Sequence, residues 1–595
     1  MIDGEVETWL GVVARRLTLA VLGAVAALAL WALGDNWRYS SGAPMLYLAL
    51  FTFTAVQSLV ALALAGPLSV TRALAGALLL SVPLTGLVGL AGLRYGNPLE
   101  ILDDSVMLAV VGVLLLFATP FLAVALQDRK RWAKYALLFD TAWTMVLRYG
   151  LALVFVGVFW LIVFLSTSLL RLVDITLVER WTSSVAVRFA VSGWVLGLGL
   201  AVMHELRAIV SPHLGLRLLR LLVPIMLVVV ALFLTALPLR GLSYLFGEFS
   251  SAGTLIATAI LAITLVSAAL ERDDAAAVQH RGLRAATRAL ALLVPLLAAL
   301  AVWAVLLRVR QYGWTPHRAL AVCVAWFLLA YGVGYGAAVI GRWGWAGRIR
   351  SVNVIMALAV VAIAALWMTP VLDVYRLSTN SQVARFQQGD AHLDQLSLWQ
   401  LEHDWGRAGQ AGLRRLEAFD AHPEHDELIA RIKTLRRQAT PFQFEQAILN
   451  RAAPESAAKL ARLLAVRPGK DRLDPDLLLD LSPWRMAQWL EGCARKLPDG
   501  QAACVMVRGA FLPSQPEDGQ GIVLYLDAAG AVQADFVVLS EAETATFRVL
   551  HDLHREAWPI LDHSALTAAL SGDFTIRPTG GNALFLDGAV LAPGY

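Results

Sequence analysis

The sequence predicts a membrane all-α bundle of about eleven transmembrane helices, followed by a soluble α+β C-terminal domain. Apolar residue types make up 58% of the 595 residues and charged types only 16%, whereas soluble globular proteins carry about 25% charged residues. Apolar runs long enough to cross a bilayer recur throughout residues 1–374, and an ordinary mixture of charged and apolar residues fills 375–595. This composition excludes a cytosolic enzyme, a disordered chain and a collagenous fibre.

The apolar runs are predicted to be the membrane spans. A transmembrane helix needs about 20 mostly apolar residues, because each residue rises about 1.5 Å through roughly 30 Å of hydrocarbon. Lipid offers the backbone no hydrogen bonds, so each run is expected to be helical. A helix at the surface of a soluble core would show a polar face, which these runs lack. The eleven runs lie near residues 17–34, 44–66, 73–92, 106–126, 149–170, 185–203, 218–237, 253–270, 286–307, 319–341 and 353–372.

The first run is predicted to be an uncleaved span rather than a secretory signal. Its apolar core covers residues 17–34, which is longer than the core of about 7–15 residues in a signal peptide. It ends in Trp31 and Gly34 without a convincing cleavage site. We therefore count it among the eleven spans.

The distribution of Lys and Arg predicts the orientation of the bundle, because these residues favour the cytoplasmic side of short loops. With a cytoplasmic N-terminus, the inside segments hold 18 of them and the outside loops hold 8. An odd number of spans then carries residues 375–595 to the opposite face. We expect a bacterial inner-membrane protein with a cytoplasmic N-terminus and a periplasmic C-terminal domain.

The chain after residue 374 is predicted to be a separate domain, helical over 378–496 and forming a small sheet over 503–595. Its net charge is −6, against +10 for residues 1–374. Segments such as CVMVRGAF and GIVLYLD follow Ala503 and are separated by Gly, Pro and Asp, which is the pattern of short strands. About 220 residues are enough to bury a core of their own.

Three cysteines bear on the compartment of this domain. Cys323 lies within a span, where it is interpreted as a small apolar filler, whereas Cys493 and Cys504 flank a Pro-Asp-Gly turn signal. Disulfides form in oxidising compartments, so a periplasmic domain favours a bridge between Cys493 and Cys504. The alternative is two unrelated buried thiols.

Two stretches of the sequence carry a resemblance to a known family. Residues 308–318 read RVRQYGWTPHR, and a second stretch from Arg376 to Leu416 begins RLSTNSQVARFQQGD. With the eleven-span layout, they resemble a bacterial multi-pass membrane family known only as domain of unknown function 4153. The resemblance implies the architecture and an inner-membrane location, and it implies neither a reaction nor a ligand. Its most specific element is R-x-x-x-Y-G-x-T-P-x-R, carried by Arg308, Tyr312, Gly313, Thr315, Pro316 and Arg318.

The predicted outside loop 308–318 is the first candidate site, since its charge opposes the trend of the other outside loops. Guanidinium groups beside aromatic rings at a membrane surface could bind an anionic lipid headgroup, a polyprenyl-type phosphate or an acidic face of the C-terminal domain. The alternative is interfacial anchoring, because Trp and Tyr favour this depth and Arg can reach water from it. The candidate residues are Arg308, Arg310, Tyr312, Trp314, His317 and Arg318.

Three further charged residues are weaker candidates. Arg188 lies within a predicted span, and intramembrane charges are often functional, although it is close enough to the outer end to reach water. Asp103 and Asp104 form an acidic pair in an outside loop, as in lipid-linked glycosyltransferases that position a metal or activate an acceptor with outside acids. Those enzymes usually carry the acids in a long first loop, and the first loop here is short.

Other functional signals are weak. Relatives in the family often carry a D-x-D-x-D-G turn, of which only Asp527 and Asp535 remain here, so no calcium site is expected. The sequence has no phosphate-binding loop, dinucleotide fingerprint or C-x-x-C motif. We expect no cofactor, no metal and no nucleic-acid partner; the expected partners are the lipid bilayer and an envelope protein or anionic lipid.

The sequence leaves three functional hypotheses open. The leading one is a non-catalytic protein for envelope sensing, scaffolding, or lipid or partner binding, with enzyme activity undecided. A transporter is the first alternative, because prolines at 83, 120, 224 and 295 interrupt spans. A lipid-linked glycosyltransferase is the second. An enzyme should show a groove with acids at the outer membrane face, a transporter a polar cavity at mid-depth, and a scaffold a closed bundle.

Overall fold

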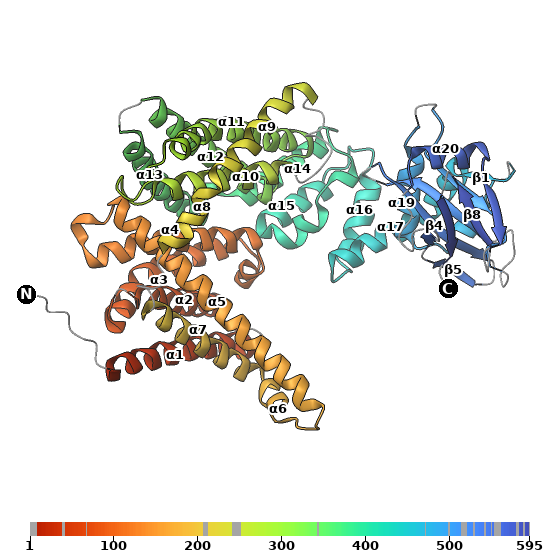
Figure 1. Ribbon diagram of the computed structural model, residues 1–595. Helices are drawn as coiled ribbons and strands as arrows, with labels where there is room; N and C mark the ends of the chain where they lie inside the picture. Colours follow the sequence, from red (N-terminus) through yellow and green to blue (C-terminus); the bar gives the residue numbers. More distant parts are fainter. Residues whose placement is uncertain are drawn as a thin grey trace, which may run out of the picture. The chain divides into compact units, whose positions relative to one another are not determined.

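The computed structural model divides the chain into two compact units, Met1–His422 (unit 1) and Pro423–Tyr595 (unit 2), which are described separately (Figure 1). The residues that the structure describes are 9–37, 42–66, 68–205, 212–240, 251–341, 344–469, 472–497, 500–512, 520–527, 530–540, 543–548, 550–552, 561–578, 582–586 and 589–593.

Unit 1 confirms the predicted membrane bundle. Within its described residues, eleven helices are long and apolar enough to cross a bilayer, and each coincides with one predicted run. The seventh span combines α8 (Pro212–Leu221) with α9 (Val223–Arg240). The other helices that supply spans are α1 (Trp9–Ala32), α2 (Pro44–Leu64), α3 (Val70–Gly92), α4 (Ser105–Gln127), α5 (Tyr135–Arg171), α7 (Val185–Glu205), α10 (Ser251–Leu270), α11 (Arg281–Tyr312), α12 (Pro316–Ile340) and α13 (Trp345–Trp367).

Small residues let the helices of unit 1 approach closely. Gly193 and Gly197 of α7 form a small-xxx-small pattern facing α1, and a Cβ atom on Gly193 would overlap the backbone oxygen of Gly23. Such patterns replace the hydrophobic effect as the source of association between helices in lipid. In the same way, Pro295 of α11 packs against Gly332 of α12, where a Cβ would lie 2.7 Å from the proline Cα.

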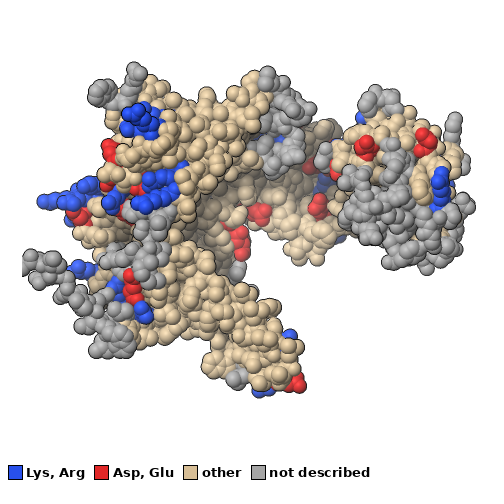
Figure 2. Space-filling model, in the orientation of Figure 1, with Lys and Arg blue, Asp and Glu red and all other residues tan. Residues whose placement is uncertain are grey.

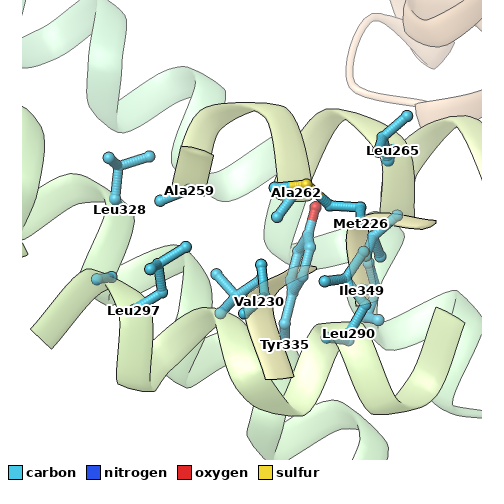
Figure 3. Packing of buried hydrophobic residues seen from close by; sticks show 14 of the residues in the cluster. Met226, Val230, Ala259, Ala262, Leu265, Leu290, Leu297, Leu328, Tyr335 and Ile349 are labelled. Atoms are coloured by element: carbon cyan, nitrogen blue, oxygen red, sulfur yellow. The ribbon is translucent and has the colours of Figure 1, made fainter. Parts of the chain in front are cut away.

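Helices α9 to α13 of unit 1 pack around a cluster of buried leucines, valines and alanines (Figure 3). Tyr335 is fully buried in it, and its hydroxyl group donates to Asn353 Oδ1 at 2.6 Å and lies 3.0 Å from Ser267 Oγ. Asn353 Nδ2 in turn donates to Ser267 Oγ at 3.2 Å. The polar groups of α10, α12 and α13 thus satisfy one another inside an apolar core, as a low-dielectric interior requires.

Short elements follow the last span and remain in unit 1. They are α14 (Val374–Gln387), a 3₁₀ turn η7 (Leu393–Gln395), a π-helical turn η8 (Gln400–Asp404) and α15 (Gly406–Glu417). Gly406 has φ of 53°, and a Cβ there would lie 2.5 Å from the backbone oxygen of Arg94, so glycine fits the contact with the backbone that follows α3. The predicted boundary at residue 374 marks the end of the apolar, membrane-spanning composition, and it stays a prediction. The two compact units divide at a different place, after His422.

Unit 2 has the predicted α+β composition. Its first sheet has the order β1-β2-β3-β4-β5, antiparallel except for the parallel pair β1–β2, and its second has the order β6-β9-β8-β7. The helices are α16 (His425–Leu435), α17 (Pro441–Leu463), α18 (Pro475–Leu478), α19 (Pro483–Ala494) and α20 (His563–Ser571). The strands are β1 (Ala465–Arg467), β2 (Cys504–Arg508), β3 (Gln520–Leu526), β4 (Val532–Ser540), β5 (Glu543–Arg548), β6 (Leu550–Asp552), β7 (Thr575–Pro578), β8 (Asn582–Leu586) and β9 (Ala589–Pro593).

Two elements of unit 2 differ from the simple order of helices followed by strands. Residues Ala465–Arg467, within the region 378–496 expected to be helical, form β1 and pair with β2. The helix α20 lies between β6 and β7 in the sequence. Asp562 caps its N-terminus by accepting hydrogen bonds from Ser564 N at 2.9 Å and Ala565 N at 3.1 Å. Both differences involve short elements that depend on tertiary partners.

The Cys493–Cys504 disulfide is present and joins α19 to β2, with the two Cα atoms 4.9 Å apart. Both cysteines lie in the core on the α17–α19 side of the first sheet, beside Trp489. Asp535 of β4 accepts hydrogen bonds from Trp489 Nε1 at 2.8 Å and from Arg485 Nη1 at 3.1 Å. Asp535 is therefore a structural acceptor.

Candidate functional site

The family-like element 308–318 forms the tight connection between α11 and α12. Gly313 ends α11 with φ of 75°, a conformation that favours glycine. Thr315 is the N-cap of α12, its hydroxyl group accepting from Arg318 N at 3.3 Å, and Pro316 occupies the first turn. The residues G-x-T-P thus supply the turn chemistry that two consecutive helices need.

Both motif arginines gather around Tyr312. The guanidinium carbons of Arg308 and Arg318 lie 5.8 Å and 5.4 Å from the centre of its ring, within the range of cation–π attraction. Arg318 Nη1 also donates to the backbone oxygens of Tyr312 at 3.1 Å and Gly313 at 3.0 Å. These contacts hold two cations at the C-terminal end of α11, where the helix dipole is negative.

Side chains of helix α14 form hydrogen bonds with the backbone of the same connection. Gln382 Nε2 donates to the backbone oxygens of Tyr312 at 3.0 Å and Trp314 at 3.1 Å, and Ser381 Oγ accepts from Trp314 N at 3.1 Å. Arg385 donates to the backbone oxygens of Arg310 at 3.0 Å and Gln311 at 2.8 Å. The two family-like stretches are therefore in contact with each other in unit 1.

The acidic pair begins α4, with Asp104 as its N-cap. Asp104 Oδ1 accepts from Val106 N at 2.8 Å and Met107 N at 3.1 Å. Its other oxygen accepts from the hydroxyl group of Tyr95 at 2.5 Å and from that of Tyr375. Burial, reinforced by the Asp104 carboxylate, raises the pKa of both tyrosines well above the ordinary value, so they act as permanent donors.

The acidic pair and the motif connection meet at one pocket of about 740 Å³ in unit 1. Ser105 Oγ and His317 Nε2 lie 3.4 Å apart and join the start of α4 to the start of α12. The pocket is lined by Tyr95, Glu100, Asp103, Asp104, Ser105, Val106, Ala252, Gly253, Ile256, Val305, Arg308, Thr315, Pro316, His317, Arg318, Ala321, Tyr375, Ser397, Gln400, His403, Asp404 and Trp405.

The pocket has an apolar wall and a charged rim. Apolar side chains from the ends of α4, α10, α11 and α12 form the wall: Val106, Ile256, Val305 and Ala321. Four carboxylates and two guanidinium groups share the rim with His317 and His403: Glu100, Asp103, Asp104, Asp404, Arg308 and Arg318. Burial raises the pKa of Asp404, nearby Asp104 raises it further, and His403 and His317 oppose the shift. The acids are therefore close enough to influence one another.

A family model for a domain of unknown function, DUF4153, matches residues 13–404, which is about two thirds of the chain. This chain belongs to that family. No curated protein and no solved structure matches it. The DUF4153 region contains every residue that lines the pocket except Trp405. The pocket is therefore built almost entirely by the family's own segment, whereas unit 2 lies beyond it.

The DUF4153 fold brings together five residues that the sequence predicted in separate places, namely Asp103, Asp104, Arg308, His317 and Arg318. The other three loop candidates, Arg310, Tyr312 and Trp314, are not among the lining residues; Tyr312 instead supports the two arginines. Arg188 lies exposed in the first turn of α7. Cys493 and Cys504 belong to unit 2.

Sequence reasoning missed Glu100, Asp404 and Tyr375 as pocket residues. A signal was available for two of them, since Glu100 stands in NPLEILDDS beside the acidic pair, and Asp404 stands in LEHDW within the second family-like stretch. Tyr375 gave no signal, because only the fold places it next to Asp104. In the described part of the chain, no group of three or more His, Cys, Asp or Glu residues is arranged to hold a metal ion.

Sequence reasoning also missed buried arginines of unit 1 outside the pocket. Helix α5 begins at Tyr135, well before the predicted run 149–170, so Arg148 lies within it and is only 5% exposed. Arg350, 8% exposed, donates to Asp274 Oδ1 at 2.7 Å and to the backbone oxygen of Leu270 at 2.8 Å. Arg220 pairs with buried Glu271. These arginines satisfy carbonyl and carboxylate groups and hold helix ends together.

Proposed function

We propose that this membrane protein binds the polar headgroup of a membrane lipid in the 740 Å³ pocket of unit 1. The observation that carries the proposal is the combination of an apolar wall made by the ends of four spans with a rim of charged side chains. An amphiphile needs both surfaces, one for the start of its chains and one for its headgroup. Binding without turnover is the non-catalytic role that the sequence favours.

The position of the pocket along the spans supports a site at headgroup depth. If successive spans cross the bilayer in alternating directions, the starts of α4, α10 and α12 and the end of α11 lie at one membrane face. Every span that lines the pocket contributes that end. Charged groups are stable at this depth because they reach water and lipid phosphates.

The orientation that we propose places this face outside the cytoplasm of a bacterial inner membrane. Figure 2 supports it, because Lys and Arg of unit 1 gather mainly along one end of the helices, on the side of the α4–α5 connection, whereas the flanks are tan. The Cys493–Cys504 bridge suits an oxidising periplasm. A reporter enzyme fused after Tyr595 tests the orientation: activity restricted to the periplasm supports it, and activity restricted to the cytoplasm contradicts it.

The binding proposal is tested by lipid retention. Purified protein in mild detergent should keep co-purified lipid in native mass spectrometry. Ala321→Trp fills the wall of the pocket and should abolish the retained lipid that wild type shows. Gly157→Trp, on an open stretch of α5 where nothing lies within 4 Å of a Cβ, is the matched control. Equal retention by both variants would contradict the proposal.

A lipid-linked glycosyltransferase is the second candidate, because Asp103 and Asp404 line a pocket at one helix-end face. Asp104 already accepts four hydrogen bonds, which suits a structural role better than activation of an acceptor. The enzyme hypothesis predicts sugar transfer from a lipid-phosphate donor by wild type and its loss in Asp103→Asn. Lipid retention without transfer, in membranes supplied with such donors, would favour binding alone.

A further inference from the structure

We propose a second site in unit 1, which binds the phosphate of an anionic phospholipid where helices α11 and α13 begin. It is centred on a small pocket of about 150 Å³. Helix α10 lines the 740 Å³ pocket with its start and this small pocket with its end, so the two sites are separate. The small pocket is lined by Ala269, Leu270, Asp274, Ala277, Val278, Gln279, Arg284, Thr287, Trp345 and Ala346.

Two helices begin at this pocket. Helix α11 supplies Arg284 and Thr287 from its first two turns, and α13 supplies Trp345 and Ala346 from its first turn. Neither helix has a side-chain hydrogen bond at its N-cap or an acidic residue in its first turn. The partial positive charge of each N-terminus is therefore not offset by its own sequence, and such helix ends bind phosphate groups.

Four arginines add positive charge to the same two helix starts. Three of their side chains are exposed and one is half-buried. In the described part of the chain, none of the four has a carboxylate partner. They are Arg281, Arg284 and Arg288 on α11 and Arg348 on α13.

Other arginines near these helix ends do have carboxylate partners. The pairs are Arg220 with Glu271, Arg272 with Asp140, and Arg350 with Asp274. Asp274 also lines the small pocket, but its Oδ1 accepts from Arg350 Nη1 at 2.7 Å. Like charges that share a small region repel one another, so an anion from outside the chain would stabilise the arginines that have no acid.

Trp345 is an independent indication of a ligand. The guanidinium carbons of Arg288 and Arg284 lie 4.9 Å and 6.0 Å from the centre of its ring, which holds both cations beside the pocket. Trp345 is only 4% exposed, and among the described residues its buried Nε1 has no hydrogen-bond partner. A buried donor without an acceptor is costly, and a phosphate oxygen in the pocket that Trp345 lines would supply one.

The size and position of the pocket favour a lipid phosphate over a larger soluble ligand. Pockets for drug-sized ligands span about 300–1,000 Å³, so a pocket of about 150 Å³ suits a phosphate group and little more. If successive spans alternate in direction, the starts of α11 and α13 and the end of α10 lie at one membrane face. Basic pockets between transmembrane helices bind anionic headgroups at this depth, and the acyl chains stay in the bilayer.

The experiment is a lipid titration of delipidated, full-length Ala321→Trp protein, read by native mass spectrometry. This variant fills the large pocket, so the second site is measured by itself; wild type is titrated in parallel in case the variant does not fold. A pocket that holds only a phosphate should lose its lipid to detergent during purification and bind it again when lipid is added. Phosphatidylglycerol should bind about tenfold more tightly than phosphatidylcholine with the same acyl chains, the factor that about 1.4 kcal/mol corresponds to.

A matched pair of arginine variants tests the cluster. Arg284→Gln removes a guanidinium that lines the pocket and should weaken binding of phosphatidylglycerol about fivefold. Arg72→Gln is the control, because Arg72 is also exposed and stands in the first turn of a span, α3, but does not line the pocket. It should leave binding unchanged.

Sodium phosphate, added in a separate arm, distinguishes the two sources of a phosphate group. Displacement of phosphatidylglycerol only at a large excess of phosphate would identify the lipid as the ligand. Displacement at equimolar phosphate would assign the site to a soluble phosphate and overturn the lipid proposal.

The variants decide the remaining outcomes. A preference for phosphatidylglycerol that Arg284→Gln reduces and Arg72→Gln keeps would support the second site. Equal binding of the two lipids, or equal effects of the two arginine variants, would overturn it. Both results are independent of the large pocket, whose own test is the co-purified lipid of wild type.

Discussion

Units 1 and 2 bury their interiors by different physical means. In unit 1, glycine and alanine bring helix backbones together, and arginines such as Arg350 satisfy carbonyl groups at helix ends. In unit 2, large side chains such as Trp489 and Phe536 fill the core on the two sides of a sheet, and a disulfide ties a helix to a strand. The difference follows from the solvent. Burying an apolar side chain away from water is favourable, whereas burying it away from lipid brings no such gain.

The largest effect is expected from enlarging a glycine between α1 and α7, which tests whether close helix packing stabilises unit 1. Gly193→Leu places side-chain atoms where Gly23 has its backbone oxygen, so the helices must separate, at an expected loss of more than about 3 kcal/mol. The midpoint of thermal unfolding in detergent should fall strongly, while resistance of unit 2 to proteolysis should be unchanged. Gly157→Leu, in open space on α5, is the control; equal destabilisation by both would contradict close packing of glycines as the source of stability.

The next largest effect is expected in unit 2 from removal of the disulfide. The bridge closes a loop with a sequence separation of 11 residues, and a short loop of this kind contributes roughly 3 kcal/mol on a chain-entropy estimate. Cys493→Ser in the full-length protein should speed proteolysis of residues 423–595 and leave the midpoint of bundle unfolding in place. Cys323→Ser is the control; faster proteolysis in both variants would argue against the bridge as the cause.

A smaller effect is expected from the buried polar contact beside the disulfide. Asp535→Ala leaves Trp489 Nε1 and the Arg485 guanidinium without the acceptor they share, which costs about 1–3 kcal/mol. Proteolysis of unit 2 should become faster than in wild type but slower than in Cys493→Ser. Asp527→Ala, at the β3–β4 turn, should have less effect because its contacts are exposed. The reverse order would show that the turn matters more than the core contact.

The smallest expected effect is the pH dependence of the pocket in unit 1. Burial raises the pKa of Asp404, so this carboxyl group becomes neutral at a higher pH than an ordinary aspartate as the pH falls. Loss of its charge should change retention of the co-purified lipid by roughly twofold, a modest change because solvent screens a rim carboxylate. Asp404→Asn should remove this step; an unchanged pH profile in the variant would assign the step to another group.

The fold of unit 1 could be predicted far better than its site. Hydropathy alone located all eleven spans, because a lipid solvent leaves a run of about 20 apolar residues no other stable arrangement. The site joins residues separated by up to 310 positions, from Tyr95 to Trp405, and only helix packing determines which loops meet. The motif 308–318 is the most specific element of the sequence, yet its pattern does not separate the residues that line the pocket from those that only build the turn. The lining residues are Arg308, Thr315, Pro316, His317 and Arg318.

In unit 2, alternation of apolar residues indicated the longer strands, but the short β1 depends on pairing with β2, and α20 depends on one capping aspartate. Such elements have too few residues for periodicity to reveal them. The disulfide was predictable because a turn signal separates the two cysteines, which are only 11 residues apart.

The hydrogen bonds between α14 and the α11–α12 connection have a practical consequence for shortened versions of this protein. A chain cut directly after the last span at Trp367 would lose the donors from Gln382 and Arg385 that fix the turn, and it would lose Asp404 from the pocket. The smallest fragment expected to keep an intact ligand site therefore extends to His422, fifty-five residues past the hydrophobic segment that a hydropathy plot would choose as its end.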